Sequence, residues 1–201
     1  MKGKLFVFEG PDGVGKSTLV DKTVAYFKSN RLPYKVFSFP GREEGTLGSH
    51  VYRIHHQWKS MGINCIHPAS LQVLHIAAHI DSIENRIIPA LKSGSHVILD
   101  RFWWSTWVYG IVSGVPQHSV NAMVKLECGH WDTFLPSAVF LIHNIKPLRE
   151  DVKDSSWNEL LNTYQKLAAE EKEHYPVFYI DTNRSINDTS EEITRTIQGM
   201  C

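Results

Sequence analysis

The stretch Gly10-Pro11-Asp12-Gly13-Val14-Gly15-Lys16-Ser17 decides the fold of this chain. It has a glycine, four intervening residues and then Gly-Lys-Ser, which is the pattern of a phosphate-binding loop. An apolar run at residues 4–9 precedes it and predicts a buried strand, and residues 16–29 after it have helical spacing of apolar side chains. The motif therefore predicts a nucleoside triphosphate site, but it does not separate a kinase from a motor, a switch or a transport ATPase.

Each part of this loop has an expected role. Glycines let backbone N–H groups approach phosphate oxygens closely, and the N-terminus of the following helix adds partial positive charge. Lys16 would reach the β- and γ-phosphates of ATP, and Ser17 would offer its hydroxyl to Mg²⁺. The positions expected to contact the nucleotide are Gly10, Gly13, Val14, Gly15, Lys16, Ser17 and Thr18.

Strands alternate with helices along the rest of the chain. Further strands are predicted at residues 34–39, 96–100, 137–142 and 177–180, and helices at 50–60, 68–92, 105–113, 117–127, 156–174 and 189–198. Ser156 and Glu159 have the spacing of a capping box. The alternation predicts an α/β fold, with one domain over residues 1–201, a five-stranded, mostly parallel sheet and helices on both faces.

The composition narrows the classes of partner. Lys and Arg together number 21, as do Asp and Glu, so the formal net charge is zero. A neutral chain is not expected to bind a nucleic acid polymer or an anionic membrane through bulk charge. No apolar run reaches the roughly 18 residues that a membrane-spanning helix needs. The 3 cysteines share no short spacing, which favours neither a disulfide framework nor a zinc site, and we expect a cytoplasmic protein.

Three motifs together resemble the thymidylate kinases. They are the loop motif at residues 8–18, FPGREEGTLG at residues 39–48 and DRFWWSTWVY at residues 100–109. The resemblance implies a P-loop kinase that uses ATP and Mg²⁺ to phosphorylate a nucleoside monophosphate, with dTMP as the leading acceptor. Two alternatives stay open: another nucleoside monophosphate as acceptor, or a non-catalytic nucleotide-binding regulatory protein. Members of the family are usually homodimers, which is carried over only as a resemblance.

The resemblance also implies roles for individual side chains around the acceptor. Arg42 would clamp the acceptor phosphate, and Arg101 would contact the phosphates of both donor and acceptor. Asp12 would hold the 3′-hydroxyl of the acceptor sugar. Ser105 of the third motif would contact the acceptor nucleotide, and Tyr109 would pack near the sugar, with a core tyrosine as the alternative.

Two further roles follow from position in the chain. Asp100 ends a predicted strand, and an acid at the carboxyl edge of a parallel sheet suits a ligand to Mg²⁺ or to its waters. Residues 146–156 are charged, carry a proline and are predicted to form a lid. Arg149 is the preferred transition-state cation of this lid, with Lys146 and Lys153 as alternatives.

The family pattern changes where the base would be read. Matching the 68–92 helix to the family puts Ile76 at the position of a base-stacking phenylalanine and Ile80 at that of a base-reading arginine. Gly110 stands where a further base-reading residue is usual. These departures predict a broader or different acceptor preference. His75 and His79 have metal-ligand spacing, but no neighbouring Glu or Cys completes a set, so a polar helix face is the preferred interpretation.

Overall fold

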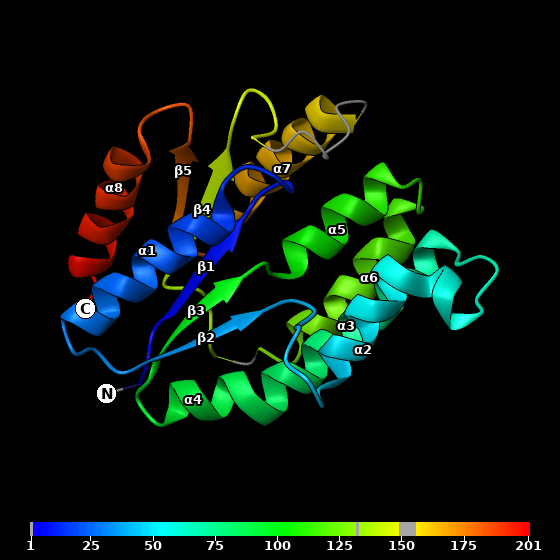
Figure 1. The fold of residues 1–201 in the computed structure, drawn as a ribbon, viewed down its shortest axis with the longest axis horizontal. Coiled ribbons are helices and arrows are strands. Elements are labelled where there is room, and N and C mark those ends of the chain that lie inside the picture. The colour runs from blue at the N-terminus through cyan, green and yellow to red at the C-terminus, as the bar shows by residue number, and fades with distance from the viewer. Residues whose placement is uncertain (1, 132, 149–155) are drawn as a thin grey trace.

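The computed structural model describes residues 2–131, 133–148 and 156–201. At its centre is a five-stranded sheet with the order β2-β3-β1-β4-β5, in which every neighbouring pair is parallel (Figure 1). The strands are β1 Leu5–Glu9, β2 Tyr34–Ser38, β3 His96–Asp100, β4 Ala138–His143 and β5 Val177–Asp181. The predicted α/β fold is confirmed, and the strand boundaries agree with the sequence expectation to within one residue.

Helices cover both faces of this sheet. Helices α1 and α8 lie together on one face, and α4, α5 and α7 lie on the other side of the strands (Figure 1). The helical segments are α1 Lys16–Ser29, α2 Leu47–Gln57, the 3₁₀ turn η1 Trp58–Met61, α3 Pro68–Ser82, the π-helical turn η2 Ile83–Ile87, α4 Ile88–Lys92, α5 Trp103–Val112, α6 Gln117–Cys128, α7 Trp157–Glu171 and α8 Ile186–Gln198. Within the described residues no helix is long and apolar enough to cross a membrane.

The central strand β1 divides its side chains between two cores. Leu5 and Val7 belong to the core under α5, and Phe6 and Phe8 belong to the core under α1 and α8. Successive residues of a strand point to opposite faces of the sheet, so an uninterrupted apolar run is needed where both faces are covered. Burial on both faces fixes β1 in the middle of the molecule, where its carboxyl end leads into the glycine-rich loop.

The long helix predicted at residues 68–92 exists but is not regular. It runs as α3, η2 and α4 without a break in the chain. Pro89 in α4 has no N–H group, so the carbonyl of Asn85 cannot receive the usual bond from four residues further on. The π-helical turn at η2 covers this position. The irregularity therefore begins before Pro89 itself.

Two helix starts differ from the sequence expectation. Helix α2 begins at Leu47 instead of residue 50, because the side chain of Thr46 accepts a hydrogen bond from the N–H of Ser49 at 3.2 Å and caps the first turn. Ser156 is the N-cap of α7, but its side chain makes no capping hydrogen bond. The predicted capping box with Glu159 is therefore wrong at its serine half.

Candidate active site

The loop between β1 and α1 has the backbone conformation that its glycines predict. Gly10, Gly13 and Gly15 have φ values of 135°, 84° and 92°. A Cβ atom on Gly10 would lie 2.2 Å from the carbonyl oxygen of Ile142 in β4, so only glycine fits there. Gly15 is the N-cap of α1 and has no side-chain cap, which leaves the first N–H groups of the helix available for phosphate oxygens.

Not every loop residue can bind through its side chain. Val14 has no exposed surface and belongs to the core under α1, so only its backbone can contact a nucleotide. Ser17 and Thr18 are exposed in the first turn of α1, as their predicted roles require.

Lys16 holds a positive charge in the middle of the loop. Its side chain is 6% exposed, and Nζ donates to the carbonyl oxygens of Gly10 at 2.8 Å and Pro11 at 2.7 Å. Burial, followed by the charge of Arg101, lowers the pKa of Lys16 to about 8, and the nearby carboxylates oppose this. The ammonium group therefore needs anions close to it to stay fully charged above neutral pH.

Asp12, Arg101 and Tyr109 form a triangle at the tip of the loop. Arg101 forms an ion pair with Asp12, and the hydroxyl of Tyr109 donates to Oδ2 of Asp12 at 3.2 Å. The N–H of Asp12 in turn donates to the Tyr109 oxygen at 3.0 Å. Burial alone would raise the pKa of Asp12, but the charges of Arg101 and Lys16 outweigh it and lower the pKa to about 2. The structure thus brings these three predicted site residues together.

Glu9 at the end of β1 connects the loop to the start of α5, and no role was predicted for it. Its carboxylate has no exposed surface. Oε1 accepts from the N–H groups of Phe102 at 2.6 Å and Ser105 at 3.0 Å, and Oε2 accepts from the N–H of Gly10 at 3.1 Å and the hydroxyl of Ser105 at 2.8 Å. Burial raises the pKa of Glu9. An acid ending an apolar strand was the available sequence signal.

Ser105 lies inside this network, which differs from the predicted contact with the substrate. It is 8% exposed, and its hydroxyl bonds to Glu9 and lies 2.9 Å from the hydroxyl of Tyr164 in α7. Nη1 of Arg101 donates to the same hydroxyl at 2.8 Å. The Ser105 hydroxyl thus lies between Glu9 and Arg101, where it positions the Arg101 guanidinium.

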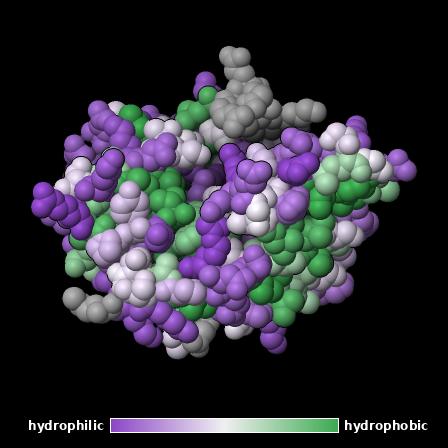
Figure 2. Space-filling model, turned by 60° about the horizontal axis from the view of Figure 1, so that its bottom comes forward, coloured by the Kyte–Doolittle hydropathy of each residue, from purple (hydrophilic) through white to green (hydrophobic). Residues whose placement is uncertain are grey.

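A cavity with a volume of about 280 Å³ opens beside the loop. Ser17, Asp100 and Arg42 line it, so residues from all three sequence motifs meet there. Figure 2 shows a hollow in the middle of one face, flanked mainly by hydrophilic residues. The Arg42 guanidinium is exposed and lies 4.7 Å from the ring centre of Tyr52 in α2.

Asp100 has an oxygen that the protein does not use. Its Oδ1 atom is buried and has no hydrogen-bond partner among the described residues. A buried carboxylate oxygen without a partner is costly, which suits a position that binds a cation or its waters. The described residues contain no group of three or more His, Cys, Asp or Glu side chains that could hold a metal on their own.

The expected base-reading positions of α3, Ile76 and Ile80, do not line the cavity beside the loop, and Ile76 is 3% exposed. Their neighbours His75 and His79 do not line it either. These two histidines carry the polar contacts of this part of the helix. The ring of His79 stacks on Phe39 with centres 3.9 Å apart, and Nε2 of His75 lies 2.9 Å from Nδ1 of His55.

His75 is half-buried and lies among other histidines. Burial, then the neighbouring histidines and Arg101, lower its pKa to about 2, so the ring is neutral. His79 is 2% exposed, and its Nδ1 lies 2.8 Å from Oε2 of the buried Glu127. The polar face predicted for these histidines is therefore not a solvated one.

Gly110 lies at the contact between α5 and α6. It is buried, and a Cβ atom added to it would lie 3.1 Å from Cγ2 of Val120 in α6. The absence of a side chain therefore permits close packing of α5 on α6.

The predicted lid begins against the loop. The N–H of Leu148 donates to the carbonyl of Gly13 at 2.8 Å. Cδ1 of Leu148 lies 3.4 Å from the position that a Cβ atom on Gly15 would take. Arg149 and Lys153, two of the three candidate lid cations, lie outside the described residues.

Comparison with known proteins identifies the family. A sequence model of the family described as thymidylate kinase matches residues 8–193. A thymidylate kinase of Bradyrhizobium diazoefficiens is 35% identical over 129 residues, 64% of this chain and 54% of that protein. One of Chlorobium chlorochromatii is 36% identical over 141 residues, 69% of this chain and 59% of that protein. The chain thus spans little more than half the length of these two relatives. One of Caldicellulosiruptor saccharolyticus is 28% identical over 213 residues, 100% of this chain and 98% of that protein. The chain belongs to the thymidylate kinase family.

Proposed function

We propose that the protein transfers the γ-phosphoryl group of ATP to a nucleoside monophosphate, with dTMP as the acceptor and dTDP as the product. The observation that carries this proposal is the position of Arg101. Its ion pair with Asp12 joins it to the phosphate-binding loop. It also lies at the edge of β3, directly after Asp100, and Asp100 and Arg42 line the same cavity. A switch or a plain ATPase needs one phosphate site, whereas a monophosphate kinase needs two that face each other.

The donor side would be formed by the glycine-rich loop. Its N–H groups, the N-terminus of α1 and the Lys16 ammonium would hold the phosphates of ATP. Ser17 and the unpartnered oxygen of Asp100 fit Mg²⁺, since both line one cavity and both offer oxygen. When bound, Mg²⁺ neutralises charge on the β- and γ-phosphates.

The acceptor side would use the arginines. Arg42 would bind the acceptor phosphate, and Arg101, fixed by Ser105 and Asp12, would stabilise the charge that develops on the transferring group. The pKa of Arg101 lies well above its usual value, because the charge of Asp12 and the nearby Tyr109, Tyr164 and Glu9 outweigh its burial. Asp12 and Tyr109 would contact the acceptor sugar.

Ile76 and Ile80 stay the proposed base-contacting positions of α3, and their neighbour His75 is proposed with them. The rings of His75 and His79 lie with centres 6.0 Å apart, and His79 is buried, stacked on Phe39 and bonded to Glu127. Neutral imidazole can both donate and accept a hydrogen bond, so it offers a way to read a base edge that isoleucine lacks.

The lid and the assembly complete the proposal. Residues 146–156 would close over the nucleotides, with Arg149 as the cation that reaches the transferring group and Lys146 and Lys153 as alternatives.

A homodimer in the cytoplasm is the proposed form. Val73 of α3 and Leu126 of α6 are 50% and 59% exposed, which supports an apolar contact there. Light scattering on the wild type and on Val73→Glu tests this, and a monomeric wild type would exclude the homodimer.

A coupled assay of ADP formation tests the proposed function. Purified protein with ATP and Mg²⁺ should form ADP only when a nucleoside monophosphate is added, and fastest with dTMP. Fast ADP formation without any monophosphate would identify an ATPase. ATP binding without turnover on any monophosphate would favour a regulatory protein. A higher kcat/KM with another monophosphate would replace dTMP as the acceptor.

A further inference from the structure

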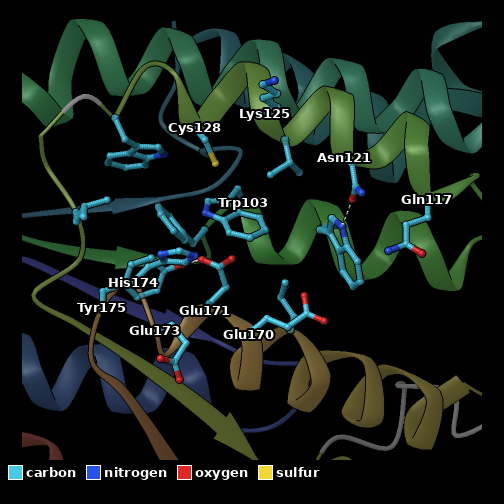
Figure 3. Close-up of a pocket in the computed structure, with 16 residues that line it drawn as sticks. Trp103, Gln117, Asn121, Lys125, Cys128, Glu170, Glu171, Glu173, His174 and Tyr175 are labelled. Carbon is cyan, nitrogen blue, oxygen red and sulfur yellow. Dashed lines mark hydrogen bonds between the residues drawn. The ribbon is translucent and has the colours of Figure 1, made fainter.

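A second, larger cavity lies away from the phosphate-binding loop. It has a volume of about 610 Å³ and is enclosed by α5, α6 and the C-terminal end of α7 (Figure 3). This volume lies within the range of about 300–1,000 Å³ that small-molecule sites occupy. None of the loop residues 10–18 lines it.

Helix α5 separates this cavity from the active site. Successive helix residues are about 100° apart, so Trp103 and Trp107 lie roughly opposite Ser105 and Tyr109 on the same helix. Ser105 and Tyr109 contact Glu9 and Asp12, whereas both tryptophans line the cavity. The proposed phosphoryl-transfer reaction gives the cavity no role.

The walls of the cavity are aromatic. Trp103, Trp107 and Trp131 line it together with Phe102 and Tyr175. Nε1 of Trp107 donates to Oδ1 of Asn121 at 2.8 Å, which holds that indole in place. Trp131 is 3% exposed, and its buried Nε1 has no hydrogen-bond partner among the described residues. A donor is therefore available within a largely buried aromatic wall.

The charge at the cavity is negative. Glu170, Glu171 and Glu173 line it, against a single Lys125. Figure 3 shows Glu171 directed toward Trp103. Oε2 of Glu171 accepts from the Tyr175 hydroxyl at 2.6 Å, and within the described part of the chain none of the three glutamates forms an ion pair. The carboxylates therefore lack a cation.

We infer that this cavity binds a small organic cation with a flat ring. Its ring packs against the indoles of Trp103 and Trp107, and its protonated nitrogen lies between these π faces and the carboxylates of Glu170 and Glu171. Cations bind to tryptophan faces and carboxylates for the same electrostatic reason, and desolvation strengthens both contacts. An anion of the same shape is repelled by the glutamates.

Tryptamine serves as the probe, and indole-3-acetate, which has the same ring with a negative charge, is its matched control. The chain has six tryptophans, whose indole N–H signals can be followed in an NMR spectrum of ¹⁵N-labelled protein. Tryptamine is expected to shift the signals of Trp103 and Trp107 saturably and to leave those of Trp58 and Trp157 in place. Indole-3-acetate is expected to leave all of them in place.

Two variants make the test specific. The double change Glu170→Gln and Glu171→Gln removes the charge but keeps an acceptor for Tyr175, and it should weaken tryptamine binding at least about tenfold. Glu159→Gln removes a charge from the other end of α7 and should leave the affinity unchanged. Tryptamine should stay bound in saturating ATP, and it should bind the Lys16→Ala variant as tightly as the wild type. These two results would separate this site from the proposed reaction. Equal shifts with both probes, shifts that do not saturate, or displacement by ATP would overturn the inference.

Discussion

The carboxylate of Asp12, in the loop after β1, forms an ion pair with Arg101, the residue directly after β3. The two residues are 89 positions apart in the chain. Arg101 has a positive φ of 74°, an uncommon conformation for a residue with a side chain. The pair therefore joins the loop to the strand edge that carries Asp100.

Lys16→Ala should abolish phosphoryl transfer. The buried ammonium in the centre of the loop is the group that neutralises the β- and γ-phosphates. ADP formation in the coupled assay is expected to fall at least about a thousandfold. Lys22→Ala, which removes an exposed lysine two turns further along α1, should keep wild-type turnover. Full activity of Lys16→Ala would refute the assignment of the loop.

Arg42→Ala should raise the KM for the monophosphate and leave ATP affinity nearly unchanged. Loss of one charge-assisted phosphate contact costs about 1.5–3 kcal/mol, which is about 10- to 150-fold in affinity. Titration calorimetry with each nucleotide measures the two affinities separately. Arg53→Ala, an exposed arginine of α2, is the control. Weaker ATP binding with unchanged monophosphate binding would mean that the two sites are reversed.

Asp12→Asn should make stability less dependent on pH in the acid range. The folded pKa of Asp12, about 2, lies below its ordinary value of 3.8. Its stabilising contribution is therefore fully present above about pH 5 and is lost as the pH falls toward 2. The side chain is 65% exposed, so screening limits the contribution to about 1 kcal/mol. Urea unfolding at pH 6 and pH 3 should show a smaller gap between wild type and variant at pH 3. A gap independent of pH would contradict this.

Residues 146–156 should gain protection from hydrogen exchange when both nucleotide sites are filled. The contact of Leu148 with Gly13 places the start of this segment on the loop that would hold the phosphates. A bisubstrate analogue that joins adenosine to thymidine should slow exchange there, whereas ADP alone should have little effect. Arg149→Ala should lower kcat more than Lys153→Ala. Unchanged exchange together with wild-type turnover of Arg149→Ala would remove the lid role.

His75→Ala should change the choice between acceptor bases. Losing one base-reading hydrogen bond alters discrimination by about 1–3 kcal/mol, or roughly 5- to 150-fold. The measurement is kcat/KM with thymidine, deoxyuridine and deoxycytidine monophosphates. Ile80→Ala is the comparison, because the family match puts a base-reading residue at position 80. An effect of Ile80→Ala without one of His75→Ala would assign base reading to Ile80 and remove it from His75.

The sequence predicts the elements that depend on local pattern. β3 and α1 have the predicted boundaries, because glycines and apolar runs mark them directly. The inward face of α3 is less clear from the sequence. Moving one residue along a helix rotates the side chain by about 100°, and isoleucine and histidine alternate there without a clear apolar stripe. Only the contacts of His75 and His79 with α2, Phe39 and α6 decide which face points inward.

The role of Glu9 could not be predicted for a different reason. A buried carboxylate is explained by its partners, and these are N–H groups at residues 10, 102 and 105, whose approach depends on the complete sheet. The same holds for Ser105. The family pattern identifies it, but the position of Tyr164 in α7 determines that its hydroxyl is already engaged.

The bonds of Glu9 set a limit on protein engineering with this scaffold. If the glycine-rich loop were transplanted into another α/β protein without the segment at residues 102–105, the fully buried carboxylate would lose three of its four donors. Replacing Glu9 with an apolar residue in the graft would remove that penalty, but the loop would then lack every bond that joins it to residues 102–105 in this protein. The smallest unit that can be transferred is therefore two separate pieces of chain, which recombination at a single crossover point cannot deliver together.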